Sequence, residues 1–251
     1  MAELAVIEEQ LINEHDLYPV HEEDSVPETP QHLMQWQYML GAVQAERPKL
    51  WVTGDTCLYW EKGNTRRYVA PDIAVIQCPP PDEPENVYLR WSDPPLLFVA
   101  EIGSRSTLRR DTGPKVTLYQ NDLKVPEYLY FDRPRKDFRF WRMVNGKYVR
   151  VQPDERGRVW SEQLELWFGP DERGFLRIYT GDGRMLLTHV EERQRFDEEA
   201  ARADEEAARA DEEAARAREA AARAEEETRR RTDLERRLEE MTAELERLRG
   251  Q

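Results

Sequence analysis

The sequence has little cysteine and no long apolar run. Its two cysteines, Cys57 and Cys78, do not have the spacing of a metal site. We therefore expect no disulfide framework, and a reducing compartment is the simpler interpretation. No apolar run is as long as a membrane span, and the acidic N-terminus lacks the apolar core of a signal peptide. The sequence thus predicts a cytoplasmic protein that does not bind a membrane.

Positive charge is also scarce. The chain contains 51 acidic residues against 37 Lys and Arg, which gives a net charge of −14. Half of this excess, −7, belongs to residues 191–251, so the remainder of the chain also carries −7. An acidic chain has no general attraction for nucleic acid. Any contact with nucleic acid would therefore need a local basic patch. No helix-turn-helix or zinc-finger pattern is present.

The composition divides the chain into three parts. Residues 1–28 are acidic and resemble a loop. Residues 29–190 hold all seven tryptophans and are numerous enough for one domain with an apolar core. Residues 191–251 consist almost entirely of Ala, Glu, Arg and Asp. We expect an acidic N-terminal segment, one globular domain and a charged C-terminal helix.

A seven-residue repeat predicts the C-terminal helix. The unit Asp-Glu-Glu-Ala-Ala-Arg-Ala begins at Asp197 and recurs from Asp204 and Asp211. An alanine seam precedes a leucine seam, whose members are Leu234, Leu238, Met241, Leu245 and Leu248. Apolar spacing of this kind is typical of a coiled coil, so we expect this helix to make the protein a homodimer. A single solvated helix held by charge pairs is the alternative.

The globular part contains both helical and strand-like segments, which predicts an α/β or α+β fold. Thr29-Pro30 has the residue types of a helix start, so a helix is expected over residues 32–45 and a second one over 113–121. Later segments alternate around turns and indicate antiparallel strands. The expected strands cover residues 50–53, 56–60, 68–76, 96–102, 125–131, 138–143, 147–151, 164–168 and 175–179.

Two carboxylates in apolar surroundings suggest a metal site. Asp72 lies in the apolar run 68–76, and Glu101 lies near the end of the run 96–102. An ionised carboxylate in a buried strand is unfavourable unless something pairs with it. Magnesium takes one or two carboxylates and keeps several waters. If the two strands are neighbours, Asp72, Glu101 and the backbone carbonyl of Ile102 could hold Mg²⁺ or Mn²⁺.

Lys115, on a short polar helix, could complete a hydrolytic site. A bound metal polarises a phosphoryl oxygen and lowers the pKa of a water, and a lysine could orient that water or stabilise charge on the phosphate. We expect catalysis to depend on Asp72, Glu101 and Lys115. Possible supporting residues are Glu23, His32, Ser104 and Asp111. Candidate phosphate contacts are Arg105, Arg109 and Arg110.

Each candidate also has a structural alternative. Asp72 could pair with an arginine such as Arg67. Glu101 could form a buried pair with Lys115 without any metal, and Lys115 could instead be an ordinary surface lysine. The supporting residues are of types that often cap helices or form turns, and the arginines could belong to a solvated loop. The sequence alone leaves these alternatives open.

The order of the candidate residues resembles a nuclease superfamily. Pro71-Asp72, followed by a strand that carries Glu101, is similar to the PD-(D/E)XK nucleases. Their lysine follows the second acid by two residues, where this chain has Gly103. The longer pattern is similar to the Uma-type putative restriction endonuclease family, and it consists of residues 99–107, Arg110-Asp111, Lys115, Tyr119 and residues 125–128. Its most specific part is the ordered set Asp72, Glu101, Ser104, Asp111, Lys115 and Glu127-Tyr128. In that family the lysine is thought to have moved to the next helix, which points to Lys115.

The resemblance covers roughly residues 15–190. It implies a restriction-endonuclease-like fold, with a mixed central sheet flanked by helices and a charged helical tail. It also implies a DNA endonuclease that uses Mg²⁺ or Mn²⁺. The acidic net charge and the glycine at position 103 favour an alternative, a catalytically inactive nuclease fold that recruits partners through its coiled coil.

Overall fold

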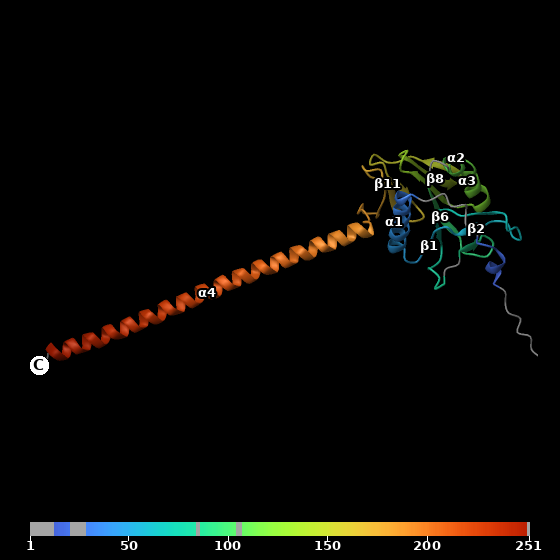
Figure 1. Ribbon diagram of the computed structural model, residues 1–251. Coiled ribbons are helices and arrows are strands. Elements are labelled where there is room, and N and C mark those ends of the chain that lie inside the picture. The colour runs from blue at the N-terminus through green and yellow to red at the C-terminus, as the bar shows by residue number, and fades with distance from the viewer. Residues whose placement is uncertain (1–12, 21–28, 84–85, 104–106, 250–251) are drawn as a thin grey trace, which may run out of the picture. The chain divides into compact units, whose positions relative to one another are not determined.

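The computed structural model describes residues 13–20, 29–83, 86–103 and 107–249, with side chains as far as residue 243. Three predicted site residues, Glu23, Ser104 and Arg105, lie outside these ranges. The chain divides into two compact units, Met1–His189 and Val190–Gln251, and each is described by itself (Figure 1). In the described ranges, no helix is both long enough and apolar enough to cross a membrane.

A six-stranded mixed sheet forms the centre of the first unit. Its strand order is β1-β4-β6-β7-β8-β9; β6 and β7 run parallel, and the other neighbours are antiparallel. The strands are β1 (Trp51–Thr53), β4 (Ile73–Ile76), β6 (Leu96–Ile102), β7 (Glu127–Asp132), β8 (Asp137–Val144) and β9 (Lys147–Val151). The α+β class and the mixed central sheet expected from the sequence are therefore confirmed.

Two small sheets accompany the central one. One has the order β3-β2-β5, and the other has the order β10-β11-β12. Their strands are β2 (Cys57–Tyr59), β3 (Tyr68–Val69), β5 (Val87–Leu89), β10 (Val159–Ser161), β11 (Leu166–Pro170) and β12 (Leu176–Tyr179). The sequence pattern misses β5 and β10, although it finds β1 and β2, which are equally short. It also joins β3 and β4, which the break at Pro71-Asp72 separates.

Helix α1 (Pro30–Glu46) covers one face of the central sheet (Figure 1). It begins as predicted, because the Thr29 side chain accepts a hydrogen bond from the His32 amide and Pro30 occupies the first turn. Its buried Met39 and Val43 join a core cluster with β4, β6 and β12. The other short helices are η1 (Glu14–Leu17), α2 (Leu108–Asp111), α3 (Pro114–Leu118) and the π-helical η2 (Tyr119–Leu123).

The alternation of side chains along the strands separates the two faces of the sheet. Ile73 and Ala100 pack on the α1 side, whereas Ala74 and Val99 pack with residues of η2 on the opposite side. Successive side chains point to opposite faces, so Glu101 shares the second face with Val99. The antiparallel register pairs Ile73 with Ala100, and its continuation by one residue brings Asp72 beside Glu101. Asp72, the residue before β4, therefore lies beside Glu101 of β6.

The second unit is the long helix α4 (His189–Arg249). Ion pairs recur along it in steps of seven residues, and they join Glu205 to Arg209, Glu212 to Arg216, Glu219 to Arg223 and Glu226 to Arg230. Leu234, Leu238 and Met241 are 63–69% exposed, whereas the side chains of Leu245 and Leu248 lie beyond the described ones. An exposed helix of this kind is compatible with a single solvated helix and with one strand of a coiled coil, so dimerisation stays a prediction.

Candidate active site

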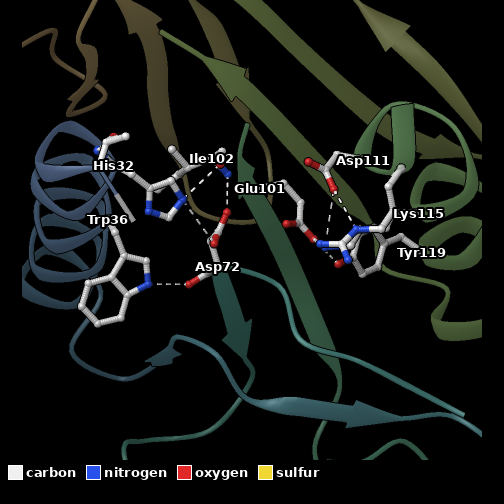
Figure 2. Close-up of polar contacts among 10 residues, drawn as sticks. His32, Trp36, Asp72, Glu101, Ile102, Asp111, Lys115 and Tyr119 are labelled. Carbon is white, nitrogen blue, oxygen red and sulfur yellow. Dashed lines mark hydrogen bonds and ion pairs between the residues drawn. The ribbon is translucent and has the colours of Figure 1, made fainter. Parts of the chain in front are cut away.

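Asp72 is held between the end of β6 and helix α1. Its Oδ2 accepts a hydrogen bond from the Ile102 amide at 2.5 Å, and its backbone carbonyl accepts one from Trp36 Nε1 at 2.7 Å (Figure 2). Arg67 pairs instead with Glu61, at 3.4 Å, so the alternative partner considered for Asp72 is wrong. The backbone of β6 thus fixes the Asp72 carboxylate, and helix α1 fixes the Asp72 backbone.

His32 lies beside two of the predicted metal ligands. Its Nε2 is 3.5 Å from Asp72 Oδ1 and 3.1 Å from the carbonyl oxygen of Ile102 (Figure 2). His32 and Trp36 are one helical turn apart, so α1 presents both on the same face. Sequence reasoning placed His32 near the site but did not find Trp36, whose signal was this four-residue spacing.

Glu101 is buried within a network of donors. Only 4% of this residue is exposed, and its Oε1 accepts hydrogen bonds from Lys115 Nζ at 2.7 Å and from Tyr119 OH at 2.5 Å (Figure 2). Lys115 Nζ also lies 3.5 Å from Asp111 Oδ1. The buried pair of Glu101 and Lys115 considered from the sequence is present. The view of Lys115 as a surface lysine is wrong, because it is only 5% exposed.

Helix α3 and its π-helical continuation deliver the two donors. Lys115 and Tyr119 are four residues apart, which puts them on one side of the helix. The chain changes from α to π geometry at Tyr119, a feature frequent at functional sites. The Tyr119 ring packs against Tyr128, with 4.9 Å between the ring centroids. Tyr119 was not among the predicted site residues, although its spacing from Lys115 was visible in the sequence.

Gly103 explains why the lysine cannot occupy its standard place. A Cβ at this position would lie 2.2 Å from the hydroxyl oxygen of Tyr130, whose side chain is fully buried. The Gly103 amide also donates to the Phe131 carbonyl at 2.7 Å, which keeps the backbone close to β7. Because no side chain fits there, an amine beside Glu101 has to come from elsewhere in the chain. Lys115 provides it.

The buried charges change one another's protonation. Burial is the main cause that raises the pKa of Glu101 to about 8; Lys115 opposes this shift, and the charges of Asp72 and Asp111 add to it. Burial also raises the pKa of Asp111. For Lys115, burial lowers the pKa, but the attraction of Glu101 and Asp111 outweighs it and the pKa rises above its usual value. The amine therefore stays protonated at neutral pH.

The oxygens near the strand ends are of the kind that Mg²⁺ prefers. Both donors to Glu101 contact Oε1, and among the residues that the structure describes none donates to Oε2. Over the same residues, no group of three or more His, Cys, Asp and Glu side chains is arranged to hold a metal. A cation here would bind Asp72, Glu101 Oε2, the Ile102 carbonyl and waters, a donor set typical of magnesium.

Comparison with known proteins assigns the family. The family model Uma2, described as "Putative restriction endonuclease", matches residues 7–169. The chain belongs to the Uma2 family. It is also similar to a solved structure titled as a putative nuclease of DUF820 from Anabaena variabilis, with 12% identity and a TM-score of 0.38, over 51% of this chain and 70% of that chain. No curated protein matches the chain. The resemblance recognised in the sequence is confirmed.

Two motif residues of this Uma2 chain serve the scaffold. Glu127 is fully buried and accepts hydrogen bonds from Arg142 and Ser161, so it ties β7 to the β10 region. Tyr128 OH donates to the Asp111 carbonyl at 2.8 Å and thus fixes α2 over the sheet. Of the predicted phosphate contacts within the described ranges, Arg109 and Arg110 are exposed on α2.

Proposed function

We propose that this Uma2 protein is a metal-dependent endonuclease that hydrolyses phosphodiester bonds in DNA. Membership of a family of putative restriction endonucleases supports the nuclease class. One observation carries the finer proposal: the buried Glu101 is held through a single oxygen by Lys115 and Tyr119, and Asp72 lies just before the adjacent strand β4. A buried carboxylate with one oxygen held and the other without a donor is suited to bind a cation.

Each residue of such a site would have a different role in catalysis. Asp72, Glu101 and the Ile102 carbonyl would hold Mg²⁺ or Mn²⁺, which when bound acts as a Lewis acid and lowers the pKa of a water. Lys115 keeps its proton because its pKa is raised, so it does not serve as a general base at neutral pH. Its charge instead favours the ionised form of Glu101, which a bound metal requires, and can stabilise negative charge on the phosphate. Tyr119 fixes the rotamer of Glu101.

A cleavage assay tests this proposal. Supercoiled plasmid incubated with the protein and Mg²⁺ or Mn²⁺ should be nicked or linearised, and Asp72→Asn should abolish this activity. The asparagine retains an oxygen that can accept the hydrogen bond from the Ile102 amide, so the variant removes the charge with little change in shape. Asp82→Asn, in an exposed loop, is the matched control. Absence of cleavage with both metals, or full activity of Asp72→Asn, contradicts the proposal.

A second candidate is a binding or assembly module without catalysis. The observation that favours it is that Lys115 and Tyr119 compensate Glu101 without any metal. Calorimetric titration with Mg²⁺ separates the two candidates. Binding that is lost in Glu101→Gln supports the endonuclease, whereas identical titrations of the wild type and Glu101→Gln support the module.

We also propose that the protein is a cytoplasmic homodimer. Free Cys57 and Cys78 support a reducing compartment. The exposed apolar residues Leu234, Leu238 and Met241 follow the four-and-three spacing of a coiled-coil seam and support self-association through α4. A dimer would place two sites on one duplex, which suits cleavage of both strands.

A further inference from the structure

Positive charge is concentrated in one segment of the globular unit. Residues 133–150 contain seven Lys and Arg and one acid, Asp137, which gives a net charge of +6. Because residues 1–190 carry −7 in total, the rest of that part carries −13. The basic segment comprises the turn between β7 and β8, the whole of β8, and most of β9. We call it the basic hairpin.

The basic hairpin belongs to the same sheet as the candidate site. The register pairs Glu101 with Tyr130 on β7, and Tyr130 in turn with Arg139 on β8. These three residues therefore form one row across the sheet and share one face. Strands lie about 4.8 Å apart, so Arg139 starts about 10 Å from Glu101. That separation corresponds to about three nucleotides of a DNA strand, at 3.4 Å each.

Part of the basic hairpin is occupied by internal ion pairs. Arg142 binds the buried Glu127, Arg139 binds Asp137 and Arg135 binds Asp132. These three cations stabilise the fold through their ion pairs, which partly compensate their charge. They are poor candidates for the main contacts with a ligand.

Four other cations remain in the basic hairpin. Lys147 pairs with Val144 at the end of the hairpin farthest from Glu101, which leaves three cations available near the candidate site. Among the residues that the structure describes, Arg133, Lys136 and Arg150 form no ion pair with a carboxylate. Lys136 and Arg150 are exposed. Arg150 lies over the Trp141 ring at 5.3 Å, and Arg133 lies over the Phe175 ring at 5.7 Å, so both guanidinium groups are oriented. Oriented arginines without a carboxylate partner are suited to contact phosphate.

We propose that the basic hairpin binds the phosphate backbone of duplex DNA, with Arg133, Lys136 and Arg150 as the main contacts. The choice of DNA rests on the proposed function, whereas the anionic chemistry rests on the charge distribution alone. An otherwise acidic unit repels a polyanion, so the phosphates next to the cleaved bond need a local cationic surface. The basic hairpin provides that surface within the sheet that carries Glu101.

Fluorescence anisotropy with a labelled 30-base-pair duplex in EDTA tests the proposal. The triple variant Arg133→Gln, Lys136→Gln, Arg150→Gln should bind more weakly at low salt. Each lost phosphate contact reduces the slope of log K against log salt by about 0.9, so the slope should fall by two to three. The matched control, Arg209→Gln, Arg216→Gln, Arg223→Gln, has the same net charge but changes only α4. It should keep the wild-type slope.

Several outcomes would overturn the proposal. An unchanged slope in the triple variant, or an equal loss in the control, excludes the basic hairpin as the contact. Tighter binding of an RNA duplex of the same sequence would exclude DNA as the ligand. Because Lys136 is exposed in a turn, Lys136→Gln alone should fold normally and reduce the slope by about 0.9, which covers failure of the triple variant to fold.

The two proposals fail in different ways. Binding in EDTA needs neither metal nor cleavage. A wild-type protein that binds DNA through the basic hairpin but never cleaves it would therefore support the binding proposal and contradict the endonuclease proposal. Conversely, the wild type could cleave DNA, and the triple variant could bind and cleave it equally well. That result would support the endonuclease and contradict DNA binding by the basic hairpin.

Discussion

Glu101 combines two properties at the scale of single residues. One of its oxygens, Oε1, receives both donors, and the other, Oε2, receives none from the described residues. A carboxylate arranged in this way is oriented by the protein while it still offers an oxygen to a ligand. Outer groups that orient metal ligands commonly change affinity or activity by 10–100-fold when they are removed.

Tyr119→Phe tests the orientation of Glu101. The substitution removes the hydroxyl that donates to Oε1 and retains the ring that packs against Tyr128. A hydrogen bond to a charged group contributes about 1.5–3 kcal/mol, so Mg²⁺ affinity should fall about tenfold or more. Isothermal titration calorimetry measures the change.

The control for Tyr119→Phe is a partly buried tyrosine that packs against the same cluster. Tyr148 OH donates to the Val125 carbonyl rather than to a candidate ligand. Tyr148→Phe should therefore lose some stability and leave Mg²⁺ affinity unchanged. Equal effects of the two variants on affinity would show that the Tyr119 hydroxyl contributes only to folding.

The raised pKa of Glu101 predicts a pH dependence of metal binding. Because this pKa is about 8, the carboxyl is protonated below that pH and a metal has to displace the proton. Mg²⁺ affinity should rise as the pH increases from 6 to 8, by up to about tenfold per unit, and level off above 8. Titrations in buffers of different ionisation enthalpy should also show proton release. A flat profile over this range would contradict the prediction.

The same shift affects folding, and its sign follows from linkage. The folded state holds the Glu101 proton more tightly than the unfolded chain, whose ordinary pKa is 4.5. The contribution of this group to the free energy of unfolding is therefore complete below pH 4.5 and is lost as the pH rises to 8. Denaturant titrations of wild type and Glu101→Gln at pH 5 and 8 should differ more at pH 8 than at pH 5.

Sequence reasoning found the two acids together with Lys115 and His32 beside them, but missed two further partners. Asp72 and Glu101 were identifiable because charged residues inside apolar runs need a reason to be there. Lys115 followed from the family resemblance. Tyr119 and Trp36 were not assigned to the site, because a tyrosine or tryptophan on a helix usually indicates core packing. Only the structure shows that their polar atoms contact Glu101 and the Asp72 backbone.

The end of β6 shows how an element constrains its chemistry. Gly103 continues from this strand and lies against the buried ring of Tyr130. The parallel pairing of β6 with β7 fixes the distance between the two backbones, so a side chain at position 103 has no room to move aside. The close pairing therefore excludes the standard lysine and leaves the task to α3.

Gly103→Ala measures this constraint. Its Cβ would meet the Tyr130 hydroxyl at 2.2 Å, so the overpacked variant should be destabilised by about 1–3 kcal/mol. Gly41→Ala is the matched control, because Gly41 lies in α1 with no atom within 4 Å of the new Cβ. Alanine is the better helix former, so the control should gain up to about 1 kcal/mol. Urea unfolding distinguishes these opposite signs.

The elements that the sequence predicted well are those with clear periodicity or clear ends. Helix α1 begins at Thr29-Pro30 because both its capping signals are local. The joined strand over residues 68–76 was wrong because Pro71, which cannot donate to a ladder, ends β3 before β4 begins. The π-helical turn after α3, at which Tyr119 packs against Tyr128, has no sequence signal of its own.

At the scale of the whole molecule, positive and negative charge are distributed unevenly along the chain. The tail, residues 191–251, has a net charge of −7, and ion pairs join Arg209, Arg216, Arg223 and Arg230 to acids one turn away. The basic hairpin has a net charge of +6 within an acidic unit. The phosphate contacts predicted from the sequence lay elsewhere, at Arg105, Arg109 and Arg110. A count over windows of about twenty residues would have identified residues 133–150.

The seam of α4 gives the last prediction. Charge pairs of the kind seen along the helix contribute only about 0.3–0.5 kcal/mol each, so they do not explain why leucines recur near its end. Burial of Leu234, Leu238 and Met241 against a second copy would stabilise the helix much more. In the full chain, Leu238→Glu should therefore convert a dimer into a monomer, measured by sedimentation equilibrium. Ala243→Glu adds the same charge away from the seam and should remain dimeric.

A wild-type protein that sediments as a monomer at all concentrations would contradict the coiled coil and leave the solvated helix as the correct description. A wild-type dimer that Leu238→Glu does not disrupt would place the contact elsewhere. Dimerisation through α4 would also bring two copies of the candidate site to one duplex. In that case Leu238→Glu should still nick a plasmid but produce fewer double-strand breaks, because the two cuts become independent events.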